Sequence, residues 1–187
     1  LILVFEGNKE MSELEAGMTK EICLGNNGRY KGELAAREWL ETRFSTKKML
    51  DFDAIKGGTA DAIEVAAPWD CIENVWREMR KALEPMCTVV DCHFSHVYHN
   101  GASVYVIYHA KTDGDDKAGE ERYLQCLDTA IQTSLKYGGN VSHHHGVGTA
   151  KAKYMEAEHG KAVVYVMKAL KDAIDPKGIV NKGVLGL

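Results

Sequence analysis

Three consecutive histidines are the most chemically suggestive feature of the sequence. His143, His144 and His145 lie in the segment 142–148, which reads S-H-H-H-G-V-G. Imidazoles at this spacing cannot all be charged easily, because like charges disfavour one another, so at least one should be neutral near pH 7. A neutral imidazole can accept a proton and a charged neighbour can give one. The segment therefore indicates acid–base chemistry, and its two glycines let a ligand approach the backbone.

The chain around the three histidines is expected to be extended. Residues 140–145 lie between a predicted helix and two predicted helical stretches, 149–158 and 161–174. In an extended segment, successive side chains point to opposite sides. The first and third histidines would then face one way and the second the other.

The predicted elements from residue 60 to residue 145 follow the order β-α-β-β-α-β. A strand at 60–66 precedes a helix that Pro68 opens and Pro85 closes. Two strands, 88–98 and 102–110, form a hairpin. This order predicts an α+β fold in which a ferredoxin-like unit carries an antiparallel sheet, followed by C-terminal helices. Apolar residues at helical spacing give the core faces of the two predicted helices: Ile72, Val75, Met79 and Leu83, then Leu124, Leu127, Ile131 and Leu135.

The first part of the chain carries a second, incomplete set of elements. Leu1–Glu6 is an apolar run typical of a buried strand, and Ser12 and Glu15 form a capping box for a helix that ends at Gly25. A further helix is expected at 33–43. The strand and the first helix would suit a duplicated ferredoxin-like unit. The abrupt apolar start, without an initiator methionine, also suggests that the sequence continues upstream.

A metal site is not expected. His93, His96 and His99 have the spacing H-x-x-H-x-x-H, which suits a helix, but they lie on a predicted strand. Side chains three residues apart on a strand face opposite sides of the sheet. Adjacent histidines cannot easily reach one ion together, so the triple histidine does not change this expectation.

Composition excludes several classes of partner. The 187 residues carry 27 acidic and 23 basic side chains, a net charge of -4, which gives no footprint for nucleic acid. No apolar run approaches the roughly 18 residues of a transmembrane segment. The five cysteines are odd in number and form no C-x-x-C pair, which indicates reduced thiols and predicts a cytoplasmic location.

Several segments resemble one enzyme family. Residues 138–148, G-G-N-V-S-H-H-H-G-V-G, are similar to the G-G-x-x-S-H-H-H-G-V-G segment of the alkyldihydroxyacetonephosphate synthases, flavoproteins of the vanillyl-alcohol-oxidase-like, FAD-linked oxidase superfamily. Shorter matches support the resemblance along essentially the whole chain: Leu3–Gly7, Glu64–Asp70, Gly101–Tyr105 and Asp175–Asn181.

The resemblance implies the C-terminal, substrate-binding half of an FAD-dependent enzyme. Residues 1–145 would form a cap domain, with the ferredoxin-like unit at about 60–145, and residues 146–187 would return to the flavin site. The FAD-binding domain would precede this chain. The implied activity belongs to ether-lipid synthesis, in which a fatty alcohol replaces an acyl group at a flavin adduct. Assembly into a homodimer is left as an open alternative.

The resemblance also assigns roles to residues. The tyrosine that matches Tyr105 gives or takes a proton in this family, although the pattern alone predicts a packed strand residue at Tyr105. The histidines that match His143, His144 and His145 line the flavin site. The resemblance implies that His144, His145 and Asn181 contact the cofactor.

Two departures keep alternatives open. Leu50 stands where the family has a substrate-binding arginine, so a phosphate or carboxylate would lose a bidentate partner there. Lys182 stands where many FAD-linked oxidases have proline. One alternative is an FAD-linked 2-hydroxyacid oxidase or dehydrogenase, but in its metal-dependent members a hairpin histidine and a loop glutamate stand at the positions of Tyr105 and His144. Another is a non-catalytic module that binds an anion or a metal.

Overall fold

The structure, a computed structural model, describes residues 1–45, 58–112 and 115–187. The chain divides into two compact units, residues 1–50 and 51–187, and each is described by itself. No helix in the described ranges is both long and apolar enough to cross a membrane.

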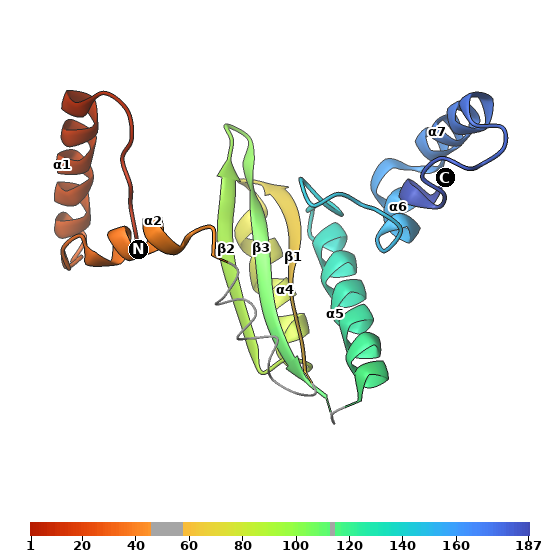
Figure 1. Cartoon of the computed structure of the whole chain (residues 1–187), viewed down its shortest axis with the longest axis horizontal. Helices are drawn as coiled ribbons and strands as arrows, with labels where there is room; N and C mark the ends of the chain where they lie inside the picture. The colour runs from red at the N-terminus through yellow and green to blue at the C-terminus, as the bar shows by residue number, and fades with distance from the viewer. Residues whose placement is uncertain (46–57, 113–114) are drawn as a thin grey trace. The chain divides into compact units, whose positions relative to one another are not determined.

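The first unit contains the helices α1 (Lys9–Gly25) and α2 (Leu34–Thr42), drawn in red and orange in Figure 1. The helix α1 begins after Asn8, because the Asn8 side-chain oxygen accepts two backbone N–H groups of the first turn, at 3.0 and 3.4 Å. The predicted capping box is therefore wrong in position, since Ser12 lies inside the helix. The predicted end at Gly25 is confirmed.

The strand predicted at Leu1–Glu6 does not form. The described residues give it no neighbouring strand, and the side chains of residues 1–4 are exposed. An apolar run becomes a stable strand only when a neighbour satisfies its backbone hydrogen bonds. The duplication of the ferredoxin-like unit is thus not confirmed.

The second unit is built on an antiparallel sheet with the strand order β1 (Gly58–Pro68), β3 (Gly101–Lys111), β2 (Val89–Val97). Side chains alternate between the two faces of each strand, and one face is apolar. That face forms the core together with helices (Figure 1). Its buried residues come from all three strands: Ile63, Val65, Val90, Val104, Val106 and Tyr108.

The helix α4 (Ile72–Leu83) packs against this face and confirms the predicted apolar stripe. Pro68 does not open this helix, as it is the last residue of β1 and the helix begins four residues later. Pro85 lies just beyond the helix end, where a proline is expected because it cannot continue a helix. The spacing of three and four residues buries Ile72, Val75, Met79 and Leu83.

The helix α5 (Asp116–Lys136) lies against β1 and α4. Leu127 and Ile131 are buried, as predicted. Leu124 is 50% exposed, because the buried stripe of this helix passes through Cys126 instead. The predicted core face of α5 is therefore correct in its middle and wrong at its start.

The fourth strand expected at residues 140–145 is reduced to one pairing. The Asn140 N–H donates to the Ala66 carbonyl of β1 at 2.9 Å, and the Ala66 N–H donates to Asn140 Oδ1 at 2.6 Å. The side-chain oxygen of Asn140 thus replaces a backbone acceptor, and the chain turns away from the sheet. The described sheet has three strands, and the observed order is β-α-β-β-α.

The C-terminal residues form the predicted helical segment. The helix expected at 149–158 starts late, as a 3-10 turn, and Gly160, with φ +80°, separates it from the next helix. The elements are η1 (Ala152–Tyr154), α6 (Met155–His159), α7 (Lys161–Ile174) and η2 (Val184–Gly186).

Asp175 holds the turn after α7. Its carboxylate accepts the backbone N–H of Val180 at 2.9 Å and that of Ile179 at 3.2 Å, and it forms an ion pair with Lys171. The hydrogen bond from Lys171 and those from the two N–H groups lower the pKa of Asp175 to about 2.

We predict that truncation of Ile131 and of Leu124, both on α5, affects stability very differently. Ile131 is fully buried, so Ile131→Ala should cost about 2–5 kcal/mol of unfolding free energy. Leu124 is half exposed, so Leu124→Ala should cost less than about 1 kcal/mol. Urea unfolding of both variants checks this, and equal losses would contradict the assignment of the core face.

A second prediction concerns acid titration of Asp175. Because its folded pKa lies below the ordinary value of 3.8, its stabilising effect is present above that pH and is lost as the pH falls toward 2. NMR titration of the carboxyl carbon should give a value near 2. In Lys171→Met the pKa should rise toward the ordinary value. An unchanged pKa in that variant would show that Lys171 is not the cause.

Candidate functional site

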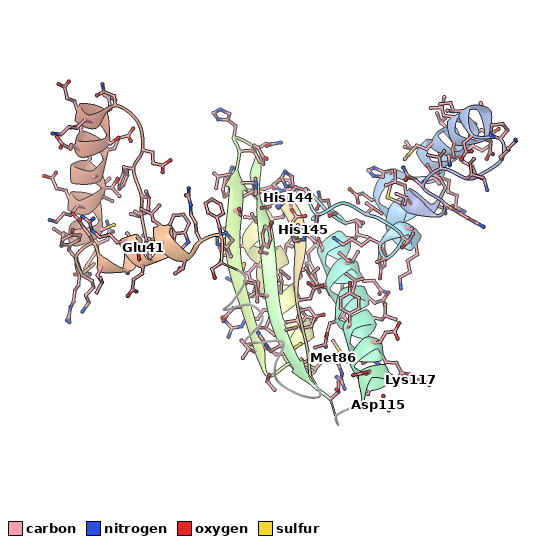
Figure 2. The ribbon with its side chains drawn as sticks, viewed as in Figure 1. Glu41, Met86, Asp115, Lys117, His144 and His145 are labelled. Carbon is pink, nitrogen blue, oxygen red and sulfur yellow. The ribbon has the colours of Figure 1, made fainter. Side chains whose placement is uncertain are left out.

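The histidine loop, residues 142–146, folds over the sheet face opposite to the core. Glu64, Tyr105 and His93 lie opposite one another in one row across β1, β3 and β2. Alternation along β1 places Glu64 on the face opposite to the buried Ile63. Figure 2 shows His144 and His145 beside this part of the sheet.

The structure brings Tyr105 together with two of the three histidines. The Tyr105 hydroxyl is hydrogen-bonded to His144 Nε2. The ring centroids of Tyr105 and His145 lie 4.9 Å apart in an edge-on arrangement. The His143 ring lies farther along the hairpin, with its centroid 5.5 Å from that of Tyr98.

The histidine loop is not extended, which corrects the prediction for residues 140–145. The Nδ1 atoms of His143 and His144 lie 2.9 Å apart, so these rings do not face opposite sides. The backbone N–H groups of all three histidines converge on one oxygen, Glu64 Oε2, at 2.9, 3.1 and 3.3 Å. Three successive N–H groups can meet one acceptor only where the chain is curved.

Glu64 is the main residue of the site that the sequence analysis did not single out. Its side chain is fully buried, and its Oε2 also accepts the Ser142 hydroxyl at 3.3 Å. Its other oxygen, Oε1, lies 3.3 Å from Nδ1 of both His143 and His144. A glutamate between Ile63 and Val65, followed by two alanines, is the sequence signal that marks it.

Lys151 is a second residue that the sequence analysis missed. It is 8% exposed, and its ammonium donates to the Ser142 hydroxyl at 3.1 Å and to the Glu64 backbone carbonyl at 3.4 Å. Burial lowers the pKa of Lys151, while the Glu64 carboxylate opposes this shift. The cation and the carboxylate are thus bridged by a hydroxyl in the interior.

The electrostatics of the site favour a charged Glu64 and a neutral His144. Burial alone would raise the pKa of Glu64, but the N–H groups of the histidine loop outweigh it and the pKa is lowered. Burial lowers the pKa of His144, with Glu64 opposing and the neighbouring imidazoles adding to the shift. Burial, and then the Glu64 charge, raise the pKa of Tyr105. At neutral pH a protonated Tyr105 therefore faces an uncharged imidazole.

His96 also joins the loop, because β2 is irregular at this point. A register shift lies between Ser95 and Val97, and His96 has φ +46°. Its ring centroid lies 4.2 Å from that of His144 and 5.6 Å from that of His143. Ring nitrogens of these three histidines lie within 4.8 Å of one another and could hold a metal ion. The argument that adjacent histidines cannot reach one ion together was therefore wrong. His93 and His99, which share the H-x-x-H-x-x-H spacing with His96, do not join this group.

Asn181 is not joined to the histidine loop by any contact that the described residues show. It is exposed, with φ +46°, and lies after α7. The C-terminal segment does return to the end of the S-H-H-H-G-V-G segment, since the Leu185 N–H donates to the Gly148 carbonyl at 3.0 Å. A cofactor contact of Asn181 stays a prediction.

Comparisons with known proteins place the chain in a family. Over residues 1–185 the chain matches the family described as FAD linked oxidases, C-terminal domain. It is 25% identical over 186 residues to alkyldihydroxyacetonephosphate synthase of Dictyostelium discoideum, covering 96% of this chain and 30% of that protein. It is 30% identical over 138 residues to the uncharacterized FAD-linked oxidoreductase YgcU of Escherichia coli, covering 69% of this chain and 28% of the other.

A solved structure supports the fold. One structure of alkyldihydroxyacetonephosphate synthase superposes with a TM-score of 0.58 and 22% identity, covering 95% of this chain and 30% of that chain. The chain thus spans about a third of the length of these relatives. Because the family match extends over nearly every residue, the chain belongs to the FAD-linked oxidases and corresponds to their C-terminal domain.

Proposed function

We propose that this chain is the substrate-binding part of an FAD-dependent enzyme in which Tyr105 and His144 move a proton beside the flavin. The observation that carries the proposal is the hydrogen bond between the Tyr105 hydroxyl and His144 Nε2. Proton transfer needs a donor and an acceptor already in contact, and this pair meets that condition. The similarity to alkyldihydroxyacetonephosphate synthase supports the proposal.

The residues around Tyr105 fit a flavin. The flavin ring has a polar edge of nitrogen and carbonyl groups, and the exposed His145 offers a ring nitrogen beside Tyr105. A Cβ atom added at Gly146 or Gly148 would meet no described atom within 4 Å, so a ligand can approach the backbone at this end of the loop. FAD, when bound, would supply the electrophilic ring at which the substrate reacts. His145 would hold its edge, and His144, whose two ring nitrogens face Tyr105 and Glu64, would lie beside the ring.

In the reaction that we propose, a fatty alcohol replaces the fatty acid of an acyl-dihydroxyacetone phosphate, so that the alkyl ether forms and the fatty acid is released. The Tyr105 oxygen takes a proton from the substrate while the Tyr105 hydroxyl proton passes to His144 Nε2. The reverse transfer returns the proton to the product, so Tyr105 and His144 end in the protonation states in which they began. A neutral His144 is required for the first transfer, which agrees with the direction of its pKa shift.

The oxidation of a 2-hydroxyacid is a second candidate. It is favoured by the similarity to the mitochondrial D-lactate dehydrogenase [cytochrome] 1 of Saccharomyces cerevisiae, which is 26% identical over 145 residues. The same pair would take the hydroxyl proton, and bound FAD would be the oxidant that takes the hydride from the substrate carbon. Leu50, which stands in place of the family arginine, lies outside the described residues. Activity assays with an acyl-dihydroxyacetone phosphate plus fatty alcohol, and with a 2-hydroxyacid plus an electron acceptor, separate the two reactions.

We predict that Tyr105→Phe lowers kcat about 10²–10⁴-fold in the flavin-containing protein, because it removes the proton that His144 accepts. Flavin content and thermal stability should stay unchanged. His144→Gln should give a loss of similar size. The measurement is turnover under both sets of assay conditions, next to the flavin absorption spectrum.

Tyr98→Phe is the matched control. Tyr98 follows β2 on the same hairpin and is 50% exposed, and its ring, like that of Tyr105, lies beside the histidine loop. Its loss should leave kcat within about twofold of the unmodified protein. Whichever of the two reactions the unmodified protein catalyses is the one to compare. Full activity of Tyr105→Phe in that reaction would refute the assignment of the proton-transfer pair.

A further inference from the structure

We propose that Glu64 is the positioning residue of this site and fixes the proton of His144 on Nδ1, which leaves Nε2 free to accept from Tyr105. The inference deepens the function proposed above and rests on it. It is carried by the separate positions of the two carboxylate oxygens, one against the loop backbone and one against the imidazoles.

The first oxygen, Oε2, fixes the course of the loop. It accepts the N–H groups of His143, His144 and His145 at 2.9, 3.1 and 3.3 Å, and the Ser142 hydroxyl at 3.3 Å. Glu64 is fully buried, so these donors replace water entirely. A concave set of successive N–H groups around an anion holds the backbone firmly.

The second oxygen, Oε1, acts on the rings. It is buried and has no hydrogen-bond partner among the described residues. It lies 3.3 Å from Nδ1 of His143 and from Nδ1 of His144. A buried carboxylate oxygen without a donor is costly, so a proton on one of these nitrogens is strongly favoured.

The position of Tyr105 decides which ring carries that proton. His144 Nε2 is the acceptor that the described part of the chain offers to the Tyr105 hydroxyl. A neutral imidazole has one donor and one acceptor nitrogen, so Nε2 can accept only if the proton sits on Nδ1. In this arrangement the three groups form a chain of contacts. Tyr105 donates to His144 Nε2, and His144 Nδ1 lies 3.3 Å from Glu64 Oε1 and 2.9 Å from His143 Nδ1.

The same chain of contacts stabilises the positive charge that develops on His144 during proton transfer. When the Tyr105 proton reaches Nε2, His144 becomes an imidazolium, and its Nδ1 proton lies beside Oε1 of the carboxylate. Glu64 stays ionised throughout and takes no proton. A carboxylate that orients a histidine in this way acts through the histidine and does not touch the substrate.

Glu64→Gln tests the proposal. A glutamine can keep its carbonyl oxygen against the three N–H groups, but it then presents an NH₂ group to the Nδ1 atoms. An NH₂ group donates, so the His144 proton should move to Nε2, where it blocks donation by Tyr105. Long-range ¹H–¹⁵N spectra of the full chain with labelled histidine report the tautomer directly. In the flavin-containing protein kcat should fall about 10²-fold or more, with KM within about twofold.

Glu158→Gln is the matched control. The Glu158 carboxylate accepts the Val141 N–H at 3.0 Å, a few residues before the histidines. This substitution has the same chemistry as Glu64→Gln on a nearby backbone contact. The tautomer of His144 and kcat should both stay as in the unmodified protein, which separates ring positioning from a general loosening of the chain.

The outcomes separate this inference from the proposed function. A His144 proton on Nε2 in the unmodified chain overturns the role of Glu64, and so does an unchanged tautomer in Glu64→Gln. If Glu64→Gln does not fold, the position of the His144 proton in the unmodified chain decides alone whether Glu64 has this role. If the unmodified protein turns over neither substrate pair, the proposed function fails while the tautomer still tests Glu64.

Discussion

The burial of one carboxylate shapes the whole candidate site. Glu64 is fully buried in the middle of β1, and an isolated charge there would cost several kcal/mol. The chain meets this cost with three backbone N–H groups and a hydroxyl, and a buried Lys151 lies one hydroxyl away. These donors come from consecutive residues, so the loop must curve around the carboxylate. The curvature places the histidine rings against Tyr105.

The sheet separates stability from chemistry. One face is packed against α4 and α5 and supplies the apolar core, while the other carries Glu64, Tyr105 and His93 in a single row. A rigid sheet fixes the spacing of this row more firmly than a loop could. The irregularity of β2 at His96 then turns one more imidazole toward the loop. Reactive groups thus gather at a surface whose backbone is held by strands.

Elements with a strong local pattern could be predicted from the sequence, and elements that depend on distant partners could not. The stripe of α4 and the hairpin of β2 and β3 follow from spacing and turn residues, and both are confirmed. Leu1–Glu6 has a strand composition but no neighbour to pair with. The shape of the histidine loop depends on Glu64, which is nearly 80 residues away, so no local pattern could show it. The three histidines could be singled out from their spacing, and the resemblance to the synthases supplied the role of Tyr105. The structure adds Glu64, Lys151 and His96.

The central claim is that Tyr105 and His144 lie beside the flavin of an FAD-linked enzyme. A crystal structure of the flavin-containing protein tests it most directly. The account predicts the flavin ring within about 4 Å of the His144 or His145 ring, with the Tyr105 hydroxyl still bonded to His144 Nε2. A flavin ring bound away from the sheet face that carries Tyr105, out of contact with all three residues, would contradict it.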